Sequence, residues 1–508
     1  MTTPEKGSVP LPELSLRQRL AAPPRLPRRR RIQDLLLHPA VWVLLAVIVG
    51  NFLGSQAGGI SQRYAKLAVG LFFIFVIFRY PTYIGAGIFL VLYAFPTTIQ
   101  LGDTNVIFTI LLAVAWMIRV GLGKELRPHR TYLDWAIVAY VAVHILSFVN
   151  ISTPVALSRS LIAIRHLFVP IILYYTIVHV GHSERRLLFL SRMFTVSIAF
   201  LYFTAFMERF APGLEFIPQW YVTALGAEQL FAEGVRHRIG GVLTHALMGD
   251  LAAIGCVHQM YLAIRAKGKP LWRIGHWFLV LVSVYIVSLT GNRGALIAML
   301  GGLFYFFWIF GGEISLKRVL VGLTIFFALL MVGEKTLGRF EGNVTLLTRM
   351  AGTYVERGVP DTRRQAWAYA WDLIRERPFL GHGPYFGHEE ASPGGKAVWP
   401  HNAFLYYFFS IGLVGLPCYL LLLWRVWRRT WAGKRLKVGG ISLARGLTAV
   451  WHIALVQFII GQMRTDHQRG DVYVYLMWII FAFGILAREL WEEERRKGAG
   501  GRAEPVRG

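Results

Sequence analysis

The feature that most constrains this chain is a series of apolar runs long enough to cross a lipid bilayer. A membrane-spanning helix needs about 20 consecutive, mostly apolar residues, and 55% of the 508 residues are hydrophobic. Runs bounded by charged residues, glycine or proline predict about 14 such helices. The sequence therefore predicts an all-α, polytopic integral membrane protein. The predicted spans are 40–57, 64–79, 81–100, 105–120, 132–150, 160–180, 186–207, 240–264, 271–290, 294–311, 318–333, 402–424, 443–463 and 472–488.

Basic residues gather in the segments between alternate spans. The chain has 54 Lys and Arg against 28 Asp and Glu, a formal net charge of +26. Cytoplasmic loops of membrane proteins are enriched in Lys and Arg, so this excess indicates basic cytoplasmic loops rather than a nucleic-acid surface. We therefore expect both termini in the cytoplasm and the long loops 208–239 and 334–401 on the outer face. ATP and nucleotide sugars are not available on that face.

A single membrane domain accounts for most of the chain. The Pro- and Arg-rich leader, residues 1–38, is too long and too early-charged for an ordinary cleaved signal, so we expect it to remain on the cytoplasmic side. Residues 39–490 form the predicted membrane domain, and residues 491–508 a basic cytoplasmic tail. Both cysteines, Cys256 and Cys418, lie in apolar segments, which supports neither a disulfide framework nor a thiolate metal site.

Residues 362–415 form a polar island in this apolar sequence. It contains a predicted helix over 362–377 that follows a Pro-Asp cap signal, then a glycine-rich turn, then a histidine where an apolar run begins. Four helix residues at helical spacing share one face, so the helix is expected to lie on the membrane or on the bundle. These four are Trp367, Ala370, Trp371 and Ile374.

Two arginines lie beside glycines where a helix begins at the expected outer edge. Arg293 stands between Gly291 and Gly294, and Arg238 precedes two glycines in the same way. A helix N-terminus offers unpaired N–H groups and a positive dipole end, and a guanidinium added there makes a seat for a diphosphate. The alternative is an interfacial arginine whose charge reaches the lipid headgroups.

Two further arginines are candidates for phosphate contact. Arg165 is predicted about two turns inside its helix, deeper than an arginine that reaches the headgroups; an ion pair or carbonyl contact within the bundle is the alternative. Arg364 lies one turn before Trp367 on the predicted amphipathic helix, where a solvated helix-end charge is the alternative.

His401 heads an apolar helix and is the candidate general base. Its ordinary pKa of about 6.5 suits removal of a proton from a hydroxyl group near neutral pH. Asn402 is a supporting residue, and the alternative role for His401 is that of a capping or interfacial histidine. His382, Glu389 and Glu390 are other possible bases in the same loop, although His382 lies in the turn LGHGP, which favours a structural role.

No cofactor is expected, because the sequence has no H-E-x-x-H, no cysteine pair and no D-x-D motif that would indicate a metal. Diphosphate is already a good leaving group. Arginines can neutralise its charge without Mg²⁺.

The order R-x-x-W helix, P-x-L-G-x-G, H-N and a membrane helix with G-L-x-G-L resembles the bacterial O-antigen ligase and O-antigen polymerase superfamily. The resemblance implies a GT-C-like, metal-independent, inverting membrane glycosyltransferase with a long periplasmic loop, in the bacterial inner membrane. It would move a glycan from undecaprenyl diphosphate to an acceptor sugar, either lipid A-core or a growing glycan. His401 would be the base, and Arg165, Arg238 and Arg293 would hold the diphosphate.

Two departures from the family pattern leave ligase and polymerase equally open: more predicted spans than are usual in ligases, and N-R-G where S-R-G is usual. The rival class is a lipid-linked oligosaccharide flippase or another secondary transporter. Such transporters usually show internal duplication and short outer loops, and the sequence shows neither. A structural scaffold protein would not account for the arginines.

Overall fold

The computed structural model describes residues 71, 74–94, 104–151, 153–210, 243, 245–311, 316–338, 361–384, 400–464 and 471–500. Within these residues the secondary structure is helical and contains no strand. The first predicted span and most of both long loops lie outside them. The helices are α5 (Thr82–Leu92), α6 (Thr104–Gly121), α7 (Asp134–Leu146), η1 (Ser147–Asn150), α8 (Pro154–Val180), α9 (Glu184–Phe210), α12 (His245–Arg265), α13 (Pro270–Leu289), α14 (Arg293–Phe310), α15 (Leu316–Gly338), α17 (Asp361–Glu376), α18 (Ala403–Thr430), η4 (Val438–Gly440), α19 (Leu443–Gln462) and α20 (Asp471–Gly500).

Eight helices of the described residues are long and apolar enough to cross a membrane, namely α8, α9, α12, α13, α14, α18, α19 and α20. Shorter apolar helices lie at Thr82–Leu92, Asn105–Gly121, Asp134–Asn150 and Thr324–Gly333. The all-α, multi-pass architecture expected from the sequence is therefore confirmed. The full count of 14 spans stays a prediction.

Several of these helices begin at a polar capping residue. The side chains of Thr153, Asn292, Asn402 and Ser442 each accept a hydrogen bond from a backbone N–H in the first turn of α8, α14, α18 and α19. Such caps satisfy N–H groups that have no partner within the helix, which matters most where water is excluded.

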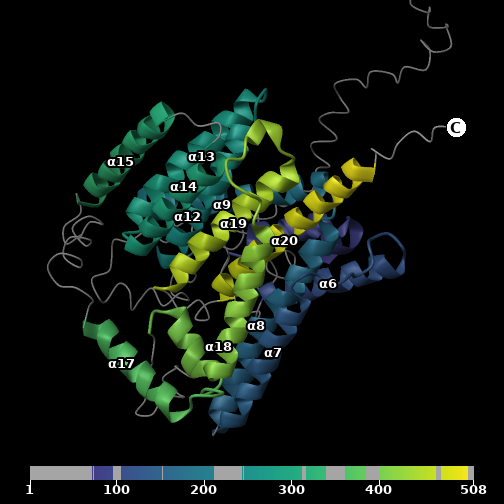
Figure 1. The fold of residues 1–508 in the computed structure, drawn as a ribbon, viewed down its shortest axis with the longest axis vertical. Helices are drawn as coiled ribbons and strands as arrows, with labels where there is room; N and C mark the ends of the chain where they lie inside the picture. The colour runs from purple at the N-terminus through teal and green to yellow at the C-terminus, as the bar shows by residue number, and fades with distance from the viewer. Residues whose placement is uncertain are drawn as a thin grey trace, which may run out of the picture. The chain divides into compact units, whose positions relative to one another are not determined.

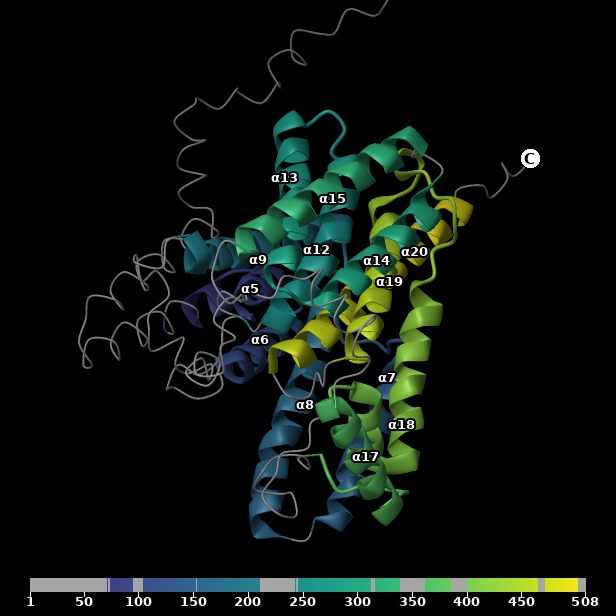
Figure 2. The same ribbon diagram turned by 90° about the vertical axis from the view of Figure 1, so that its left-hand side faces the viewer.

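The centre of the bundle is formed by α12, α19 and α20, the most deeply buried of the eight long helices (Figures 1 and 2). Helix α20 packs along α8 and α19, and α14 packs against α12 and α19. Aromatic side chains fill this centre: the rings of Trp451 and Phe483 stack with their centroids 4.5 Å apart.

Successive helices alternate in direction, so the bundle has two ends. At one end α12 and α14 begin and α19 ends; we call it the site end and mark it by Asp250 and Arg464, which form an ion pair there. At the other end α12 terminates and α19 begins; we call it the basic end. It is marked by Arg265, which donates from Nη1 to the carbonyl oxygen of Ile441 (3.1 Å).

Three sequence expectations are confirmed or corrected by these elements. The predicted helix over 362–377 is α17, Asp361–Glu376. The alternative of an Arg165 buried within the bundle is not supported, because its side chain is exposed; α8 begins at Pro154 rather than near residue 160. The predicted span 402–424 is not one straight helix, because α18 has non-helical backbone at Gly412.

Candidate active site

Helix α18 folds back on itself at Gly412. The backbone there has φ 71° and ψ −171°, a conformation that glycine adopts readily and other residues rarely do. The rings of Tyr407 and Tyr419 stack with centroids 4.0 Å apart. Twelve residues of straight helix would separate them by about 18 Å, so the first part of α18 lies beside the part that follows the break.

The glycine-rich turn after α17 fills this break. Leu413 and Val414 donate their N–H groups to the carbonyl oxygens of Pro378 (2.7 Å) and Phe379 (3.1 Å). In the other direction, turn N–H groups donate to carbonyl groups that the break leaves open: His382 to Phe409 (2.9 Å) and Gly383 to Ser410 (2.9 Å). A broken helix at membrane depth is tolerated only when its backbone groups find such partners.

The glycines of the P-x-L-G-x-G motif allow this close approach of two backbones. Gly381 has φ 64°, and a Cβ there would collide with the Ser410 carbonyl group. The turn is also tied to the segment after α7, since Asn150 Nδ2 donates to the Gly381 carbonyl oxygen (2.6 Å) and Arg377 Nη1 donates to the Asn150 carbonyl oxygen. The motif is thus an insert that stabilises the fold-back of α18.

His382 serves this insert. Its side chain is 8% exposed, and its Nε2–H donates to the carbonyl oxygen of Leu373 in α17 (2.8 Å). Burial lowers the pKa of His382 below its ordinary value, which keeps the ring neutral near pH 7. The structural role favoured from the sequence agrees with this geometry.

The first turn of α18 places His401 and Asn402. Asn402 caps the helix, because its Oδ1 accepts from the N–H groups of Phe404 (3.0 Å) and Leu405 (3.2 Å). His401 is half-buried and has a left-handed backbone with φ 49°, a conformation in which histidine is enriched among non-glycine residues. Helix α17 fixes the preceding residue, since Trp367 Nε1 donates to the Pro400 carbonyl oxygen (2.6 Å).

Helix α17 packs against the first part of α18. A small apolar cluster joins the two helices, and it includes part of the face predicted for α17. Ala370 and Ile374 are buried as expected, but Trp371 is 46% exposed, and its ring meets the edge of the Phe408 ring at 5.9 Å. The cluster consists of Ala370, Leu373, Ile374, Tyr406 and Phe409.

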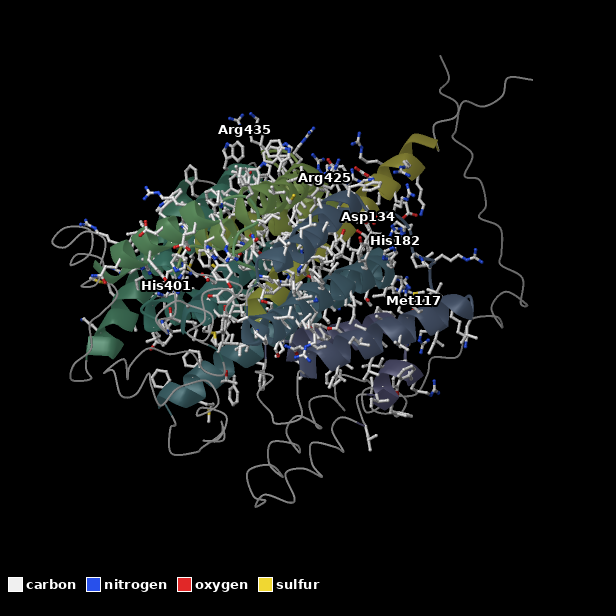
Figure 3. All side chains as sticks on the ribbon, turned by 90° about the horizontal axis from the view of Figure 1, so that it is seen from below. Met117, Asp134, His182, His401, Arg425 and Arg435 are labelled. Carbon is white, nitrogen blue, oxygen red and sulfur yellow. The ribbon has the colours of Figure 1, made fainter. Side chains whose placement is uncertain are left out.

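The fold-back returns the start of α18 toward the end of α19. The ring centroids of Phe404 and Tyr419 are 6.3 Å apart, and Tyr419 Oη donates to Gln462 Oε1 (2.5 Å). Gln462 is the last residue of α19, two positions before Arg464. A chain of contacts therefore links the His401 turn to the site end, and Figure 3 shows His401 well apart from Arg425 and Arg435 of the opposite end.

At the site end, Arg293 is the first residue of α14 and Asn292 is its cap, with Asn292 Oδ1 accepting from the Ala295 N–H (3.4 Å). Arg464 Nη1 donates to the same Asn292 oxygen (2.6 Å). Arg464 Nη2 donates to Asp250 Oδ1. The N-R-G sequence therefore lies against a buried ion pair that comes from α12 and from the turn after α19.

Asp250, Arg464 and Tyr473 complete this network and are not among the site residues expected from the sequence. Tyr473 Oη donates to Asp250 Oδ2 (3.0 Å), and the Asp250 and Arg464 side chains are only 9% and 15% exposed. The available signal was a lone acidic residue in the apolar run MGDLAAIG and an arginine directly after another apolar run. Ionisable residues in such places usually have partners and functions.

The remaining candidates are exposed or lie outside the described residues. Arg165 on α8 and Arg364 on α17 are exposed. Arg238, Glu389 and Glu390 fall outside the residues that the structure describes. Among the residues it does describe, no group of three or more His, Cys, Asp or Glu side chains is arranged to hold a metal ion.

Comparison with known families finds a match in the second half of the chain. Residues 278–420 match the O-antigen ligase family, a segment that runs from α13 through the fold-back of α18 and includes Arg293, Arg364, His401 and Asn402. No curated protein sequence matches the chain significantly. The match confirms the similarity to the O-antigen ligase and polymerase superfamily. Asp250 and Arg464 lie outside the matched segment.

Proposed function

We propose that this protein transfers or polymerises a glycan from undecaprenyl diphosphate onto an acceptor sugar at the periplasmic face of the bacterial inner membrane. The acceptor is lipid A-core for a ligase, or a growing glycan for a polymerase. The match of residues 278–420 to the O-antigen ligase family supports this class of enzyme. The reaction is metal-independent and inverts the anomeric carbon.

The observation that carries the proposal is the fold-back of α18. A straight α18 would hold His401 far from the end of α19, whereas the stacked rings of Tyr407 and Tyr419 mark a return (centroids 4.0 Å apart). The contact from Tyr419 to Gln462 then joins the His401 turn to the helix ends that carry Arg293. A base and a diphosphate seat thus belong to one end of the bundle.

The donor diphosphate is held by arginines at this end. Arg293 opens α14, so its guanidinium lies beside N–H groups at the positive end of a helix dipole. Arg238, Arg165 and Arg364 are proposed as further contacts to the same group. Charge-assisted, two-pronged hydrogen bonds from arginine stabilise the leaving diphosphate as its negative charge develops.

His401 takes the proton of the acceptor hydroxyl group. The hydroxyl oxygen forms a bond to the anomeric carbon while the bond from that carbon to the phosphate oxygen breaks. The electron pair of the broken bond leaves with the diphosphate, and the proton goes to the imidazole ring. Because attack and departure occur on opposite faces, the configuration inverts; Asn402, by capping α18, holds the turn in which His401 lies.

The site end is proposed to face the periplasm. The opposite end carries Arg186, Arg265, Arg425 and Arg445, as cytoplasmic ends do. This orientation places both termini, the 1–38 leader and the 491–508 tail in the cytoplasm, on either side of the 39–490 membrane domain. A cysteine introduced at Gly395 should react with an impermeant thiol reagent in intact spheroplasts; reaction only after lysis would reverse the orientation.

The deciding experiment uses the purified protein in lipid vesicles with undecaprenyl-diphosphate glycan, an acceptor glycan and EDTA, without ATP. We expect release of undecaprenyl diphosphate together with an elongated or ligated product. If the donor crosses the vesicle membrane without being consumed, the protein is a flippase and the transferase proposal is wrong.

A further inference from the structure

The buried pair of Arg464 and Asp250 binds three helices and a turn together at the site end. Asp250 comes from α12, Arg464 follows α19, and Tyr473 of α20 donates to the second carboxylate oxygen (3.0 Å). The pair is largely removed from solvent, with exposed fractions of 15% and 9%. A charge in such a place is held in one geometry by all its partners, unlike an ion pair at the surface.

This ion pair accounts for two residues of the sequence GNRGA, Asn292 and Gly294. Asn292 links three groups: its Oδ1 accepts from Arg464 Nη1 (2.6 Å) and from the Ala295 N–H (3.4 Å), while its Nδ2 donates to the Ala246 carbonyl oxygen (3.2 Å). Gly294 makes room, because a Cβ there would collide with the Arg464 side chain. The residues on both sides of Arg293 are therefore fitted to Arg464.

We propose that Arg464 is a positioning residue for Arg293. Through Asn292 and the space over Gly294 it fixes the backbone from which the Arg293 side chain projects, and so the direction in which that guanidinium meets the donor diphosphate. This inference rests on the proposed function. It adds a residue from outside the segment that matches the ligase family.

The positioning of Arg293 requires the planar guanidinium of Arg464, which can bind two acceptors at once. One nitrogen binds the carboxylate of Asp250 and the other binds the amide of Asn292. A lysine ammonium is a single point charge and cannot span both acceptors with the same geometry. Arg464→Lys should therefore keep the ion pair with Asp250 but release Asn292, and Gly294→Ala should displace the arginine without removing any charge.

The first test measures kcat and KM for undecaprenyl-diphosphate glycan in vesicles. We expect Arg464→Lys and Gly294→Ala to raise the donor KM. Including any decrease in kcat, kcat/KM should fall by up to about 10²-fold, which is the effect of a small misplacement of a binding group. The KM for the acceptor should stay unchanged. To allow for poor folding, the double variant Arg464→Ala with Asp250→Asn leaves no unpaired buried charge and should show the same donor-specific loss.

The second test is a double-mutant cycle with Arg293→Ala, measured as the affinity for the donor lipid. If Arg464 acts through Arg293, then Arg464→Lys in the Arg293→Ala background should change the donor affinity by less than about twofold, the scatter of independent sites. Losses that add in full would overturn the proposal, because they would show that Arg464 acts independently of Arg293.

The matched control is Arg186→Ala, which breaks the ion pair to Glu125 at the basic end (3.0 Å). It should lower the thermal stability and leave the donor KM as in the wild type. If the Arg464 variants behave like this control, Arg464 is merely structural and the inference is wrong. If the wild-type protein transfers no glycan, the proposed function itself has failed, and that result is separate from either outcome.

Discussion

Two arginine–carboxylate clusters lie at opposite ends of this helix bundle and differ in burial and in the number of their ion-pair partners. At the site end, the Arg464 and Asp250 side chains are 15% and 9% exposed. At the basic end, Arg429 and Glu492 are 24% and 20% exposed, and Glu492 has a second arginine partner, Arg488 (2.9 Å). In the basic cluster the side chains are more exposed, and Glu492 has two arginine partners. In the site cluster Arg464 and Asp250 are more deeply buried, so loss of either residue would leave the charge of the other buried without its ion-pair partner.

The neighbouring backbone differs in the same way. At the basic end the arginines rest on aromatic rings, as Arg488 does on Trp491, with 4.3 Å from Cζ to the ring centroid. Each end has one non-glycine residue with left-handed backbone, His401 near the site end and Arg435 at the basic end, and the site end also has the break at Gly412. Irregular backbone persists in a protein only when its surroundings enforce it, and it gathers at functional sites. The break at Gly412 and the more deeply buried ion pair therefore distinguish the site end from the basic end.

The largest expected effect comes from removing the base. His401→Ala should lower the rate of transfer by about 10² to 10⁴, the usual contribution of general-base catalysis, while the donor lipid still binds. Measurement of kcat and donor affinity in vesicles separates the two. The control is His182→Ala at the basic end, where His182 pairs with Glu493 (3.1 Å); that variant should transfer at the wild-type rate. A fully active His401→Ala would move the base to His382, Glu389 or Glu390.

The next effect comes from the diphosphate seat. Arg293→Ala should raise the donor KM and lower kcat by about 10²- to 10³-fold, as does loss of one donor that stabilises developing negative charge, with expression and folding unchanged. Arg293→Lys should recover only part of the rate. Arg425→Ala provides the contrast, because Arg425 donates to the Tyr132 carbonyl oxygen at the basic end (3.1 Å). Wild-type transfer by Arg293→Ala would reduce Arg293 to a headgroup anchor.

A third prediction concerns the fold-back. Gly412→Ala should lower the free energy of unfolding by about 1–3 kcal/mol from its backbone conformation alone, which is essentially restricted to glycine, and further because the Cβ meets the Phe379 carbonyl group. Tryptophan fluorescence during heating in detergent measures this. Gly322→Ala in α15 is the control: no atom lies within 4 Å of the added Cβ, so stability should be unchanged or slightly raised. Equal melting temperatures for both variants would contradict the fold-back.

A smaller effect should follow from His382 and pH. Burial lowers the pKa of His382 in the folded protein, while the unfolded value is about 6.5. The unfolded chain therefore binds the proton first, and stability should fall as the pH drops below about 6.5. The melting temperature of His382→Gln should fall less than that of the wild type between pH 7 and pH 5.5. Parallel falls would show that His382 is not a source of the acid sensitivity.

The smallest effect is expected at the basic cluster. Glu492→Gln leaves Arg429 and Arg488 near water, so it should lower the free energy of unfolding by about 0–1 kcal/mol, as partly exposed ion pairs do. The transfer rate should not change. A loss comparable to that from breaking the Arg464 pair would remove the distinction between the two ends.

The sequence predicted those parts of the fold that depend on local pattern. Apolar length gave the membrane helices, and the Pro-Asp signal with helical spacing gave α17 to within one residue at each end. The fold-back was not predictable, because a glycine within an apolar run is common in membrane helices. What makes Gly412 a break is the turn at residues 378–384, which supplies the missing backbone partners.

The candidate site shows the same limit. Arg293 and His401 could be selected from the sequence because each lies where a helix begins, Arg293 between two glycines and His401 beside Asn402. Asp250 and Arg464 did not, since 214 positions separate them in the chain and no periodicity joins residues on different helices. Their pairing depends on how α12 and α19 pack.

One consequence concerns how such a protein can diversify. Two contacts fix the backbone at Pro384 and Pro400: the Pro384 carbonyl oxygen accepts from Tyr406 Oη (3.2 Å), and the Pro400 carbonyl oxygen accepts from Trp367 Nε1 (2.6 Å). Lengthening a loop between fixed ends costs little, roughly 0.6 kcal/mol for each doubling. A change in the length of chain between Pro384 and Pro400 can therefore be accommodated over evolution while these two contacts keep the His401 turn in place.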